Sequence, residues 1–263
     1  MYFRKFVYLF KQAPVTYTTI MVCILVFLIH NFSGQPIVYL LAYYKPLILG
    51  GEYWRMITSG LCHTQVWHIF MNLYGMYIYG NIMEPMFGSK RFFILLFGSV
   101  LGGSLFLFFS ADSNLAIGLS GGLYGLMATM IYIYIRTKLI DSPQIRANLT
   151  RLLLINIMIN FAPNIAFLAH LGGFVSGFLL ANAIDQSQNK SLAMNSAIAC
   201  VILFVVLGYI GFQKKDVGSE HQYQLDVGIL RYESQLGFDN HAKNVAKELD
   251  EIYHTNIVSN SIQ

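Results

Sequence analysis

The sequence predicts an all-α protein, a bundle of helices that crosses a membrane several times. Of its 263 residues, 56% are apolar and only 11% are charged, whereas an average soluble domain carries about 25% charged residues. The mean hydropathy is +0.53. A soluble globule cannot bury so much apolar surface, and here it is gathered in stretches that approach the roughly 20 residues needed to cross a bilayer.

Seven such stretches follow one another along residues 1–213. They lie at about 15–32, 66–83, 92–110, 120–135, 152–168, 169–184 and 195–212. The first follows a basic start, as in a signal peptide, but it is long and no small-residue cleavage site follows, so we expect it to be a span. Residues 1–213 are therefore expected to form one membrane-embedded domain with seven transmembrane helices.

Basic residues are distributed unevenly between these spans. With the N-terminus in the cytoplasm, the outer loops hold only Lys45 and Arg55. The inner segments hold Arg4, Lys5, Lys11, Lys90, Arg91, Arg136, Lys138, Arg146, Arg151 and Lys190. Because Lys and Arg are enriched in cytoplasmic loops, the sequence predicts a cytoplasmic N-terminus and, after seven spans, an outer C-terminus. The lack of a transit-peptide pattern favours a bacterial cell (inner) membrane.

Two segments fall outside the spans. Residues 33–65 form an outer loop that is too apolar to be fully solvated, so we expect short amphipathic helices partly in the membrane interface. Residues 214–263 form a polar tail with eight of the thirteen acidic residues. Within it, Val245, Leu249 and Ile252 share one helix face. We expect short helices there, as a solvated pair rather than a docking site.

The composition argues against several other classes of protein. Cys23, Cys62 and Cys200 form neither a CxxC motif nor a Cys/His spacing, so we expect no disulfide framework, metal or other cofactor. A net charge of +4, concentrated beside apolar segments, indicates membrane topology rather than a nucleic-acid partner. The lipid bilayer is the expected environment, and the oligomeric state is left open.

Four polar residues inside the spans need a reason, because polar side chains are costly in a bilayer. Ser120 begins the fourth span, His170 lies near the start of the sixth, and His68 and Asn72 lie near the start of the second. All three spans descend from the outer face in the predicted topology. They therefore bring these four side chains to one depth near the outer surface.

The local pattern around Ser120 is typical of a nucleophile. Gly118 and Gly121 flank the serine at a helix N-terminus, where free backbone N–H groups can donate to a developing oxyanion. Serine needs a neighbouring base, and His170 is the candidate. Tyr124, one turn after the serine, could pack against the imidazole. No acidic residue stands where a third member would be needed, so the sequence predicts a Ser–His dyad.

The fourth and sixth spans also carry matching small residues. Gly121 and Gly125 form one GxxxG pattern, and Gly173 and Gly177 form another. Glycines at this spacing let two helix backbones approach closely. We therefore expect these two helices to touch and to bring Ser120 within hydrogen-bonding reach of His170.

These motifs together resemble the rhomboid family of intramembrane serine proteases. The resemblance covers about residues 54–184. It rests on Trp54-Arg55, on His63, His68 and Asn72 in HTQVWHIFMN, on Glu84 to Ser89 in EPMFGS, on Gly118 to Gly121 in GLSG with Tyr124 after it, and on AHLGGFVSG from Ala169 to Gly177.

The resemblance implies a six-helix core with one additional C-terminal transmembrane helix, and it implies roles for the residues. Ser120 would attack a peptide carbonyl and His170 would transfer the proton. His68, Asn72 and the Ser120 N–H would form the oxyanion hole, while Trp54, Arg55 and Glu84 would be structural. The substrates would be membrane-anchored proteins, cut in or near their transmembrane helices.

Two other functions remain alternatives. A catalytically silent rhomboid-like protein could bind transmembrane segments for trafficking or quality control, although this chain keeps both the serine and the histidine. A transporter could use the polar cluster as a substrate site, but such sites lie near the bilayer midplane between repeated halves, and no repeat is visible.

Overall fold

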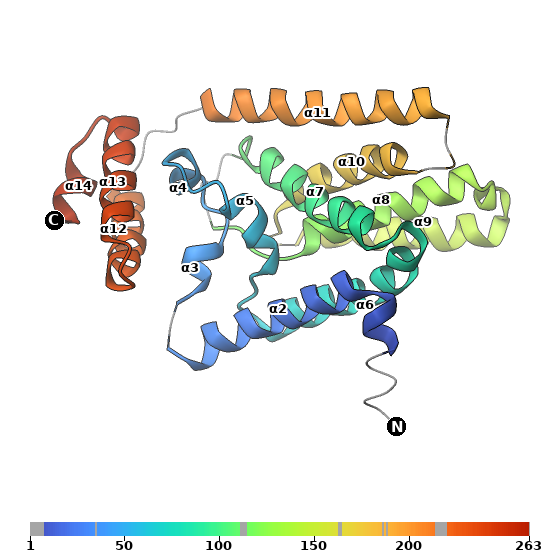
Figure 1. The fold of residues 1–263 in the computed structure, drawn as a ribbon, viewed down its shortest axis with the longest axis horizontal. Coiled ribbons are helices and arrows are strands. Elements are labelled where there is room, and N and C mark those ends of the chain that lie inside the picture. Colours follow the sequence, from blue (N-terminus) through green and yellow to red (C-terminus); the bar gives the residue numbers. More distant parts are fainter. Residues whose placement is uncertain are drawn as a thin grey trace.

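The computed structural model is a bundle of helices with a separate group of short helices at the C-terminal end (Figure 1). The structure describes residues 8–34, 36–110, 115–162, 165–185, 187, 189–213 and 220–262. Within these residues the only extended pairing is an isolated bridge between Tyr43 and Ala116. The predicted all-α fold is confirmed.

A long helix lies at each of the seven predicted spans. In chain order these are α2 (Pro14–Phe32), α6 (Val66–Phe87), α7 (Ser89–Leu107), α8 (Ser120–Arg136), α9 (Pro143–Ile159), α10 (Phe167–Ile184) and α11 (Lys190–Gln213). By length and composition alone, α2, α7, α10 and α11 could each cross a membrane. The other three are shorter or more polar: α8 and α9 have 17 residues each, and α6 carries several polar side chains.

The centre of the bundle is formed by α7, α8 and α10, which pack tightly on one another. α2 packs against α6, and α11 packs along α10 and α7 (Figure 1). Large apolar side chains also point outward, for example Met158 on α9 and Val205 and Tyr209 on α11, which are more than 60% exposed. A surface of this kind suits contact with lipid rather than water.

The predicted fifth span at 152–168 is wrong in its boundaries. α9 begins at Pro143, directly after Ser142, and ends at Ile159. Proline is favoured in the first turn of a helix because it needs no N–H partner there. The first half of α9 is polar, so hydropathy detects only its second half, and the apolar residues after Ile159 belong to the connection to α10.

Residues 33–65 contain short helices, as expected. They are α3 (Val38–Leu41), α4 (Lys45–Leu49), α5 (Arg55–Thr58) and the 3-10 turn η1 (Ser59–Leu61). A second 3-10 turn, η2 (Leu139–Asp141), precedes α9. The side chains of Tyr43, Tyr44, Leu47 and Ile48 are buried, so this segment is packed against the rest of the protein rather than solvated.

The expectation of a solvated tail is wrong. Its helices, α12 (Glu220–Gln235), α13 (Asp239–Tyr253) and α14 (Ile257–Ser261), share a hydrophobic core with Tyr44 and Leu47. The apolar face of α13 identified in the sequence is buried in that core. The sequence pattern indicated a buried face but could not indicate its partner, which lies almost 200 positions earlier. We call α12 to α14 the tail unit.

Candidate active site

Glycines bring α8 and α10 into backbone contact. A Cβ atom on Gly173 would lie 2.0 Å from the carbonyl oxygen of Gly121, and one on Gly177 would lie 2.3 Å from the Cα of Gly125. Such distances are far below van der Waals contact, so only glycine fits at these two positions. The close approach expected from the GxxxG spacing is present, and short side chains on the two helices can therefore meet.

Ser120 and His170 meet at one end of this contact. Ser120 is the first residue of α8, and His170 lies in the first turn of α10. The Nε2 atom of His170 is 2.8 Å from the Oγ atom of Ser120. The imidazole is buried and the serine is partly buried. This is the distance that proton transfer from a hydroxyl to a base requires.

The imidazole of His170 is held between two neighbours. The ring of Tyr124 stacks on it, with ring centroids 4.1 Å apart and an angle of 8° between the planes. The Nδ1 atom of His170 is 2.6 Å from Oδ1 of Asn160. Tyr124 was expected from its position one turn after Ser120. Asn160 was missed, because the predicted fifth span placed it inside a helix instead of at the end of one.

The chain just before Ser120 lies against His68. Gly118 has φ +117°, and a Cβ atom there would lie 2.6 Å from Nε2 of His68. Both the backbone conformation and the space therefore require glycine. Because Gly118 is two residues from Ser120, this contact places the His68 imidazole beside the start of α8, where the oxyanion hole was expected.

His63 also contacts the loop before Ser120. Its Nε2 atom accepts a hydrogen bond of 3.4 Å from the N–H of Leu119, and its ring meets the ring of His68 edge to face at 4.9 Å. Burial, together with the smaller effect of the neighbouring His68, lowers the pKa of His63 to about 3. The ring is therefore neutral near pH 7 and can accept this bond. The sequence indicated His63 only as part of the rhomboid-like pattern.

Asn72 lies one turn after His68 on α6 and is buried. Its Nδ2 atom donates to the carbonyl oxygen of His68 at 2.9 Å. An amide nitrogen has two N–H groups, so a second donor remains available for another acceptor. His68 and Asn72 therefore share one helix face, as the i,i+4 spacing predicts.

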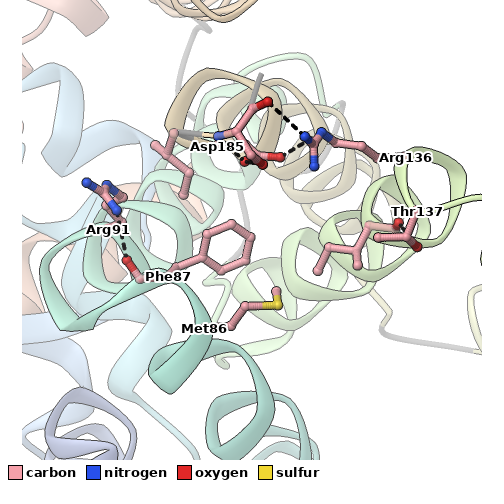
Figure 2. Close-up of a pocket in the computed structure, with 9 residues that line it drawn as sticks. Met86, Phe87, Arg91, Arg136, Thr137 and Asp185 are labelled. Carbon is pink, nitrogen blue, oxygen red and sulfur yellow. Dashed lines mark hydrogen bonds and ion pairs between the residues drawn. The ribbon is translucent and has the colours of Figure 1, made fainter. Parts of the chain in front are cut away.

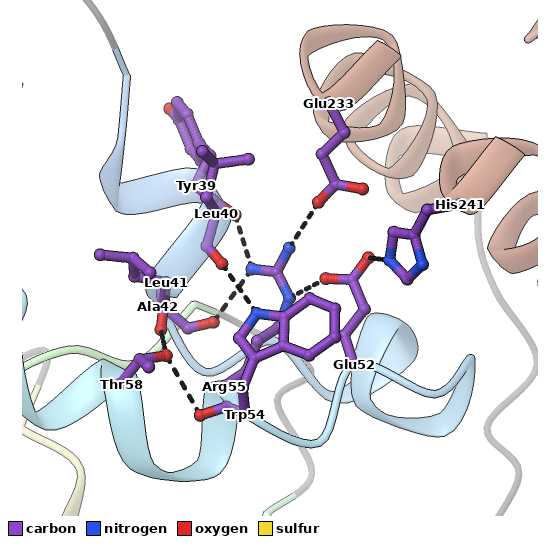
Figure 3. Close-up of polar contacts among 10 residues, drawn as sticks. All are labelled: Tyr39, Leu40, Leu41, Ala42, Glu52, Trp54, Arg55, Thr58, Glu233 and His241. Atoms are coloured by element: carbon purple, nitrogen blue, oxygen red, sulfur yellow. Dashed lines mark hydrogen bonds and ion pairs between the residues drawn. The ribbon is translucent and has the colours of Figure 1, made fainter. Parts of the chain in front are cut away.

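Arg55 and Trp54 hold the segment before the site together (Figure 3). The buried Arg55 guanidinium is ion-paired with Glu52, donates to the carbonyl oxygens of Tyr39 and Ala42, and lies 3.1 Å from Glu233 of the tail unit. Trp54 donates from Nε1 to the carbonyl oxygen of Leu40 at 3.2 Å. These contacts link α3, α5 and the tail unit.

The carboxyls around Arg55 also meet a histidine. Glu52, Glu233 and His241 bring one ligand atom each within 4.8 Å of one another, a spacing that could hold a metal ion. The Arg55 guanidinium already binds both carboxyls and supplies the positive charge between them (Figure 3). These contacts therefore describe a buried ion-pair cluster that joins the tail unit to residues 52–55.

Glu84 connects α6 to the start of α2. Its Oε1 atom accepts from the N–H of Val15 at 2.9 Å, and its Oε2 atom accepts from the N–H of Thr16 at 2.8 Å and from the Thr16 hydroxyl at 2.7 Å. The first N–H groups of a helix lack partners and attract negative charge. The carboxylate thus ties the N-terminus of α2 to the far end of α6.

A cavity of about 280 Å³ lies at the opposite end of α8 and α10 (Figure 2). It is bordered by Arg91, Arg136 and Asp185, and the guanidinium of Arg136 is 3.0 Å from the carboxylate of Asp185. Ser120 begins α8 and Arg136 ends it. The cavity is therefore a full helix length away from Ser120 and is not part of the candidate active site.

The part of the chain that contains Ser120 and His170 is similar to known proteins. Residues 50–187 match the family model of the Rhomboid domain. The rhomboid protease GluP of Bacillus subtilis is 26% identical over 201 residues, which cover 74% of this chain and 39% of GluP. The putative rhomboid protease YdcA of the same organism is 28% identical over 145 residues, covering 54% of this chain and 73% of YdcA.

The relatives also include a protein named as inactive. Inactive RHOMBOID-like protein 8 of Arabidopsis thaliana is 32% identical over 135 residues, covering 51% of this chain and 38% of that protein. The chain thus spans well under two thirds of the length of several relatives it matches. Similarity alone is therefore compatible with an active protease and with a silent relative.

Proposed function

Since the chain belongs to the rhomboid family, we propose that this multi-pass membrane protein is an intramembrane serine endopeptidase with Ser120 as nucleophile and His170 as base. The observation that carries the proposal is the 2.8 Å distance between Nε2 of His170 and Oγ of Ser120. A silent relative has no need to keep a serine hydroxyl against a buried imidazole.

The proposed reaction proceeds in two steps. In the first, Oγ of Ser120 attacks the peptide carbonyl carbon while its proton passes to Nε2 of His170. The tetrahedral intermediate collapses as the imidazolium gives that proton to the leaving amine, and an acyl-enzyme remains. In the second step, a water molecule loses a proton to His170 and attacks the ester. The imidazolium then returns the proton to Oγ of Ser120 as the ester bond breaks and the carboxylic acid product leaves.

The negative charge of the intermediate needs donors close to Ser120. The backbone N–H of Ser120 at the start of α8, the His68 imidazole beside Gly118 and the second N–H of the Asn72 amide are the proposed oxyanion hole. In this scheme His63 keeps the loop before Ser120 in place through the N–H of Leu119. Gly118, Gly121, Gly173 and Gly177 support the site by allowing the close contacts described above.

The proposed substrates are membrane-anchored proteins with transmembrane helices. A helical backbone keeps its carbonyl groups in hydrogen bonds, so a substrate must unwind locally before Ser120 can attack. Ser120 lies at the start of a helix rather than in its middle, which suits cleavage near the end of a transmembrane segment where water is available for the second step.

The proposed orientation puts the N-terminus in the cytoplasm and Ser120 towards the outer face of a bacterial cell membrane. All seven long helices would then cross the bilayer. The tail unit supports this topology, because it packs on residues 44–55, which the same topology places outside. An odd number of spans is required for the N-terminus and the tail unit to lie on opposite sides.

The alternative is a catalytically silent protein that binds transmembrane segments. The relationship to a relative named inactive is the observation in its favour. It predicts that Ser120 can be replaced without loss of function.

A cleavage assay separates the two functions. Purified protein in detergent is mixed with a panel of model transmembrane substrates, and cleavage is compared for the wild type, Ser120→Ala and the exposed control Ser191→Ala. We expect the wild type and Ser191→Ala to cut and Ser120→Ala not to cut. Labelling by a fluorophosphonate should likewise depend on Ser120. Equal cutting by Ser120→Ala, or a wild type that neither cuts nor is labelled, contradicts the protease proposal.

A further inference from the structure

We propose that Asn160 is a positioning residue that holds His170 in the tautomer with the proton on Nδ1, which leaves Nε2 free to take the proton of Ser120. The inference about the tautomer rests on hydrogen bonds alone, whereas its consequence for catalysis rests on the proposed protease function. A Ser–His dyad would then become a Ser–His–Asn arrangement.

Asn160 and Ser120 bind opposite nitrogens of the same imidazole. Oδ1 of Asn160 lies 2.6 Å from Nδ1, and Oγ of Ser120 lies 2.8 Å from Nε2. A neutral imidazole carries one proton, so one of its nitrogens is a donor and the other an acceptor. The group that fixes the protonation of Nδ1 therefore also determines whether Nε2 can accept the proton of Ser120.

The orientation of the Asn160 amide is determined by its other contacts. Its Nδ2 atom lies 2.8 Å from the carbonyl oxygen of Asn156 and 2.7 Å from the hydroxyl of Tyr124. A carbonyl oxygen can only accept, so the amide must present its NH₂ group to Asn156. A flipped amide would set two acceptor oxygens against each other. Oδ1 therefore faces His170.

The Tyr124 hydroxyl completes this assignment. It lies 3.2 Å from the same carbonyl oxygen of Asn156, to which it must donate its single proton. Its oxygen is then free to accept from Nδ2 of Asn160. Every donor in the network has an acceptor, and for a neutral imidazole no second arrangement of the protons satisfies all of these contacts.

The tautomer follows from the amide. Oδ1 of Asn160 has no proton to give, so Nδ1 of His170 must be the donor in the 2.6 Å bond. The other tautomer would oppose two lone pairs inside a partly buried site, which costs the desolvation of both. Nε2 consequently presents its lone pair to the Ser120 hydroxyl, as a general base must.

The backbone holds Asn160 in the position that its hydrogen bond to His170 requires. Asn160 is the residue directly after α9, and its N–H bonds to the carbonyl oxygens of Asn156 and Ile157 at 3.2 and 3.1 Å. The side chain therefore projects from the fixed last turn of α9 towards the first turn of α10. When Ser120 gives up its proton, the imidazolium keeps its Nδ1–H bond to Asn160, and no proton moves to the amide.

The test measures the tautomer directly by ¹⁵N NMR of protein labelled at histidine nitrogen, in detergent at about pH 9, well above the ordinary histidine pKa of about 6.5. The two nitrogens of neutral imidazole have different ¹⁵N shifts, depending on which carries the proton. The chain has seven histidines, so the His170 signals are assigned by their loss in His170→Ala. The wild type should show His170 protonated at Nδ1.

Three substitutions make the test specific. Asn160→Ala should move His170 towards the Nε2–H form and lower cleavage on the order of 10²-fold. Asn160→Asp keeps an acceptor for Nδ1–H, so it should keep the Nδ1–H signal and recover part of the activity. Asn148→Ala, which removes an exposed asparagine from α9, should change neither the tautomer nor the activity.

Either of two NMR results overturns the inference: a wild-type His170 that is protonated at Nε2, or an unchanged tautomer in Asn160→Ala. Equal activity of Asn160→Ala and Asn160→Asp also contradicts it, since a purely structural role would make no distinction between them. Failure of the protease proposal is recognised separately, by the absence of cleavage and of fluorophosphonate labelling in a wild type whose Nδ1–H tautomer is present.

Discussion

The guanidinium of Arg55 lies 3.1 Å from the carboxyl of Glu233, although the two residues are 178 positions apart in the chain. Both side chains are almost completely buried, and Glu52 binds the same guanidinium. Arg55 therefore connects the segment before the candidate active site to the tail unit. The tail unit also shares an apolar core with Tyr44 and Leu47, so docking combines burial of apolar surface with one ion-pair cluster.

Glu233→Ala is predicted to weaken docking of the tail unit. The substitution removes the carboxyl that the Nη2 group of Arg55 contacts, and a lost bond to a charged group costs about 1.5–3 kcal/mol. Hydrogen exchange followed by mass spectrometry should show faster exchange across α12 and α13, with α8 and α10 unchanged. Glu248→Ala, at an exposed position of α13, is the control. Unchanged exchange in Glu233→Ala would show that the ion-pair cluster does not hold the tail unit.

Docking of the tail unit is also predicted to weaken as the pH rises. Burial raises the pKa of Asp226 from 3.8 to about 6, although the hydroxyls of Tyr44 and Tyr253 favour its ionised form. Burial and the neighbouring Glu52 raise the pKa of Glu233, against the opposing effect of Arg55. Since the docked state holds more protons than the undocked state above about pH 4, stability is complete below that pH and is lost as the pH rises through 6 and beyond.

Exchange rates in α12 and α13 at about pH 5 and about pH 8, corrected for the intrinsic effect of pH on exchange, measure this dependence. Asp226→Asn and Glu233→Gln should each flatten it, because an amide does not titrate. Two results contradict the assignment of this pH dependence to Asp226 and Glu233. One is docking that strengthens as the pH rises, and the other is an unchanged pH dependence when both substitutions are combined.

The contact between α8 and α10 could be predicted from the sequence because its cause is local. Glycines four residues apart fall on one helix face whatever the rest of the chain does, so Gly121, Gly125, Gly173 and Gly177 indicated the contact directly. The same holds for Ser120 and Tyr124, which lie one turn apart on α8. Alternating directions of the spans then placed His170 at the same depth.

Asn160 and the docked tail unit could not be predicted in the same way. Apolar residues continue past Ile159, so hydropathy did not show where α9 ends. Asn160 was therefore placed inside a predicted span, and its position at the end of a helix could not be recognised. The partner of the α13 apolar face lies in residues 44–47, and nothing in either segment indicates the other. Both features depend on how separate elements meet, which residue spacing does not encode.

Gly118→Ala is predicted to abolish most activity without unfolding the protein. The new methyl group would lie 2.6 Å from Nε2 of His68 and would need φ +117°, which disfavours any residue except glycine. The loop must shift, and Ser120 two residues later shifts with it, which costs on the order of 10²-fold in cleavage. Fluorophosphonate labelling of Ser120 should slow in parallel.

Gly51→Ala is the matched control for this prediction. Gly51 also has a positive φ, at +109°, but a Cβ atom there meets nothing within 4 Å. The Gly51→Ala variant should carry the same kind of backbone strain and lose stability. Its Ser120 should nevertheless keep most of its rate of fluorophosphonate labelling. Equal loss of labelling in both variants would mean that strain alone, rather than the contact with His68, explains the effect at Gly118.

Tyr124→Phe is predicted to act on His170 through Asn160. The ring remains, so the stacking at 4.1 Å on the imidazole is kept, but the hydroxyl that accepts from Nδ2 of Asn160 at 2.7 Å is lost. The Asn160 amide keeps its bond to the carbonyl oxygen of Asn156, which still orients it. Cleavage should therefore fall by roughly 10-fold, which corresponds to the loss of one hydrogen bond of about 1.4 kcal/mol, and less than in Asn160→Ala.

The comparison that decides this prediction is a double-mutant cycle. If the hydroxyl acts only through the amide, Tyr124→Phe should have little further effect in the Asn160→Ala background, because the contact it supports is already gone. The reference is Tyr124→Ala, which removes both the hydroxyl and the stacked ring and should lose more activity than Tyr124→Phe. Additive losses of Tyr124→Phe and Asn160→Ala would mean that the hydroxyl serves the reaction by a route that does not pass through Asn160.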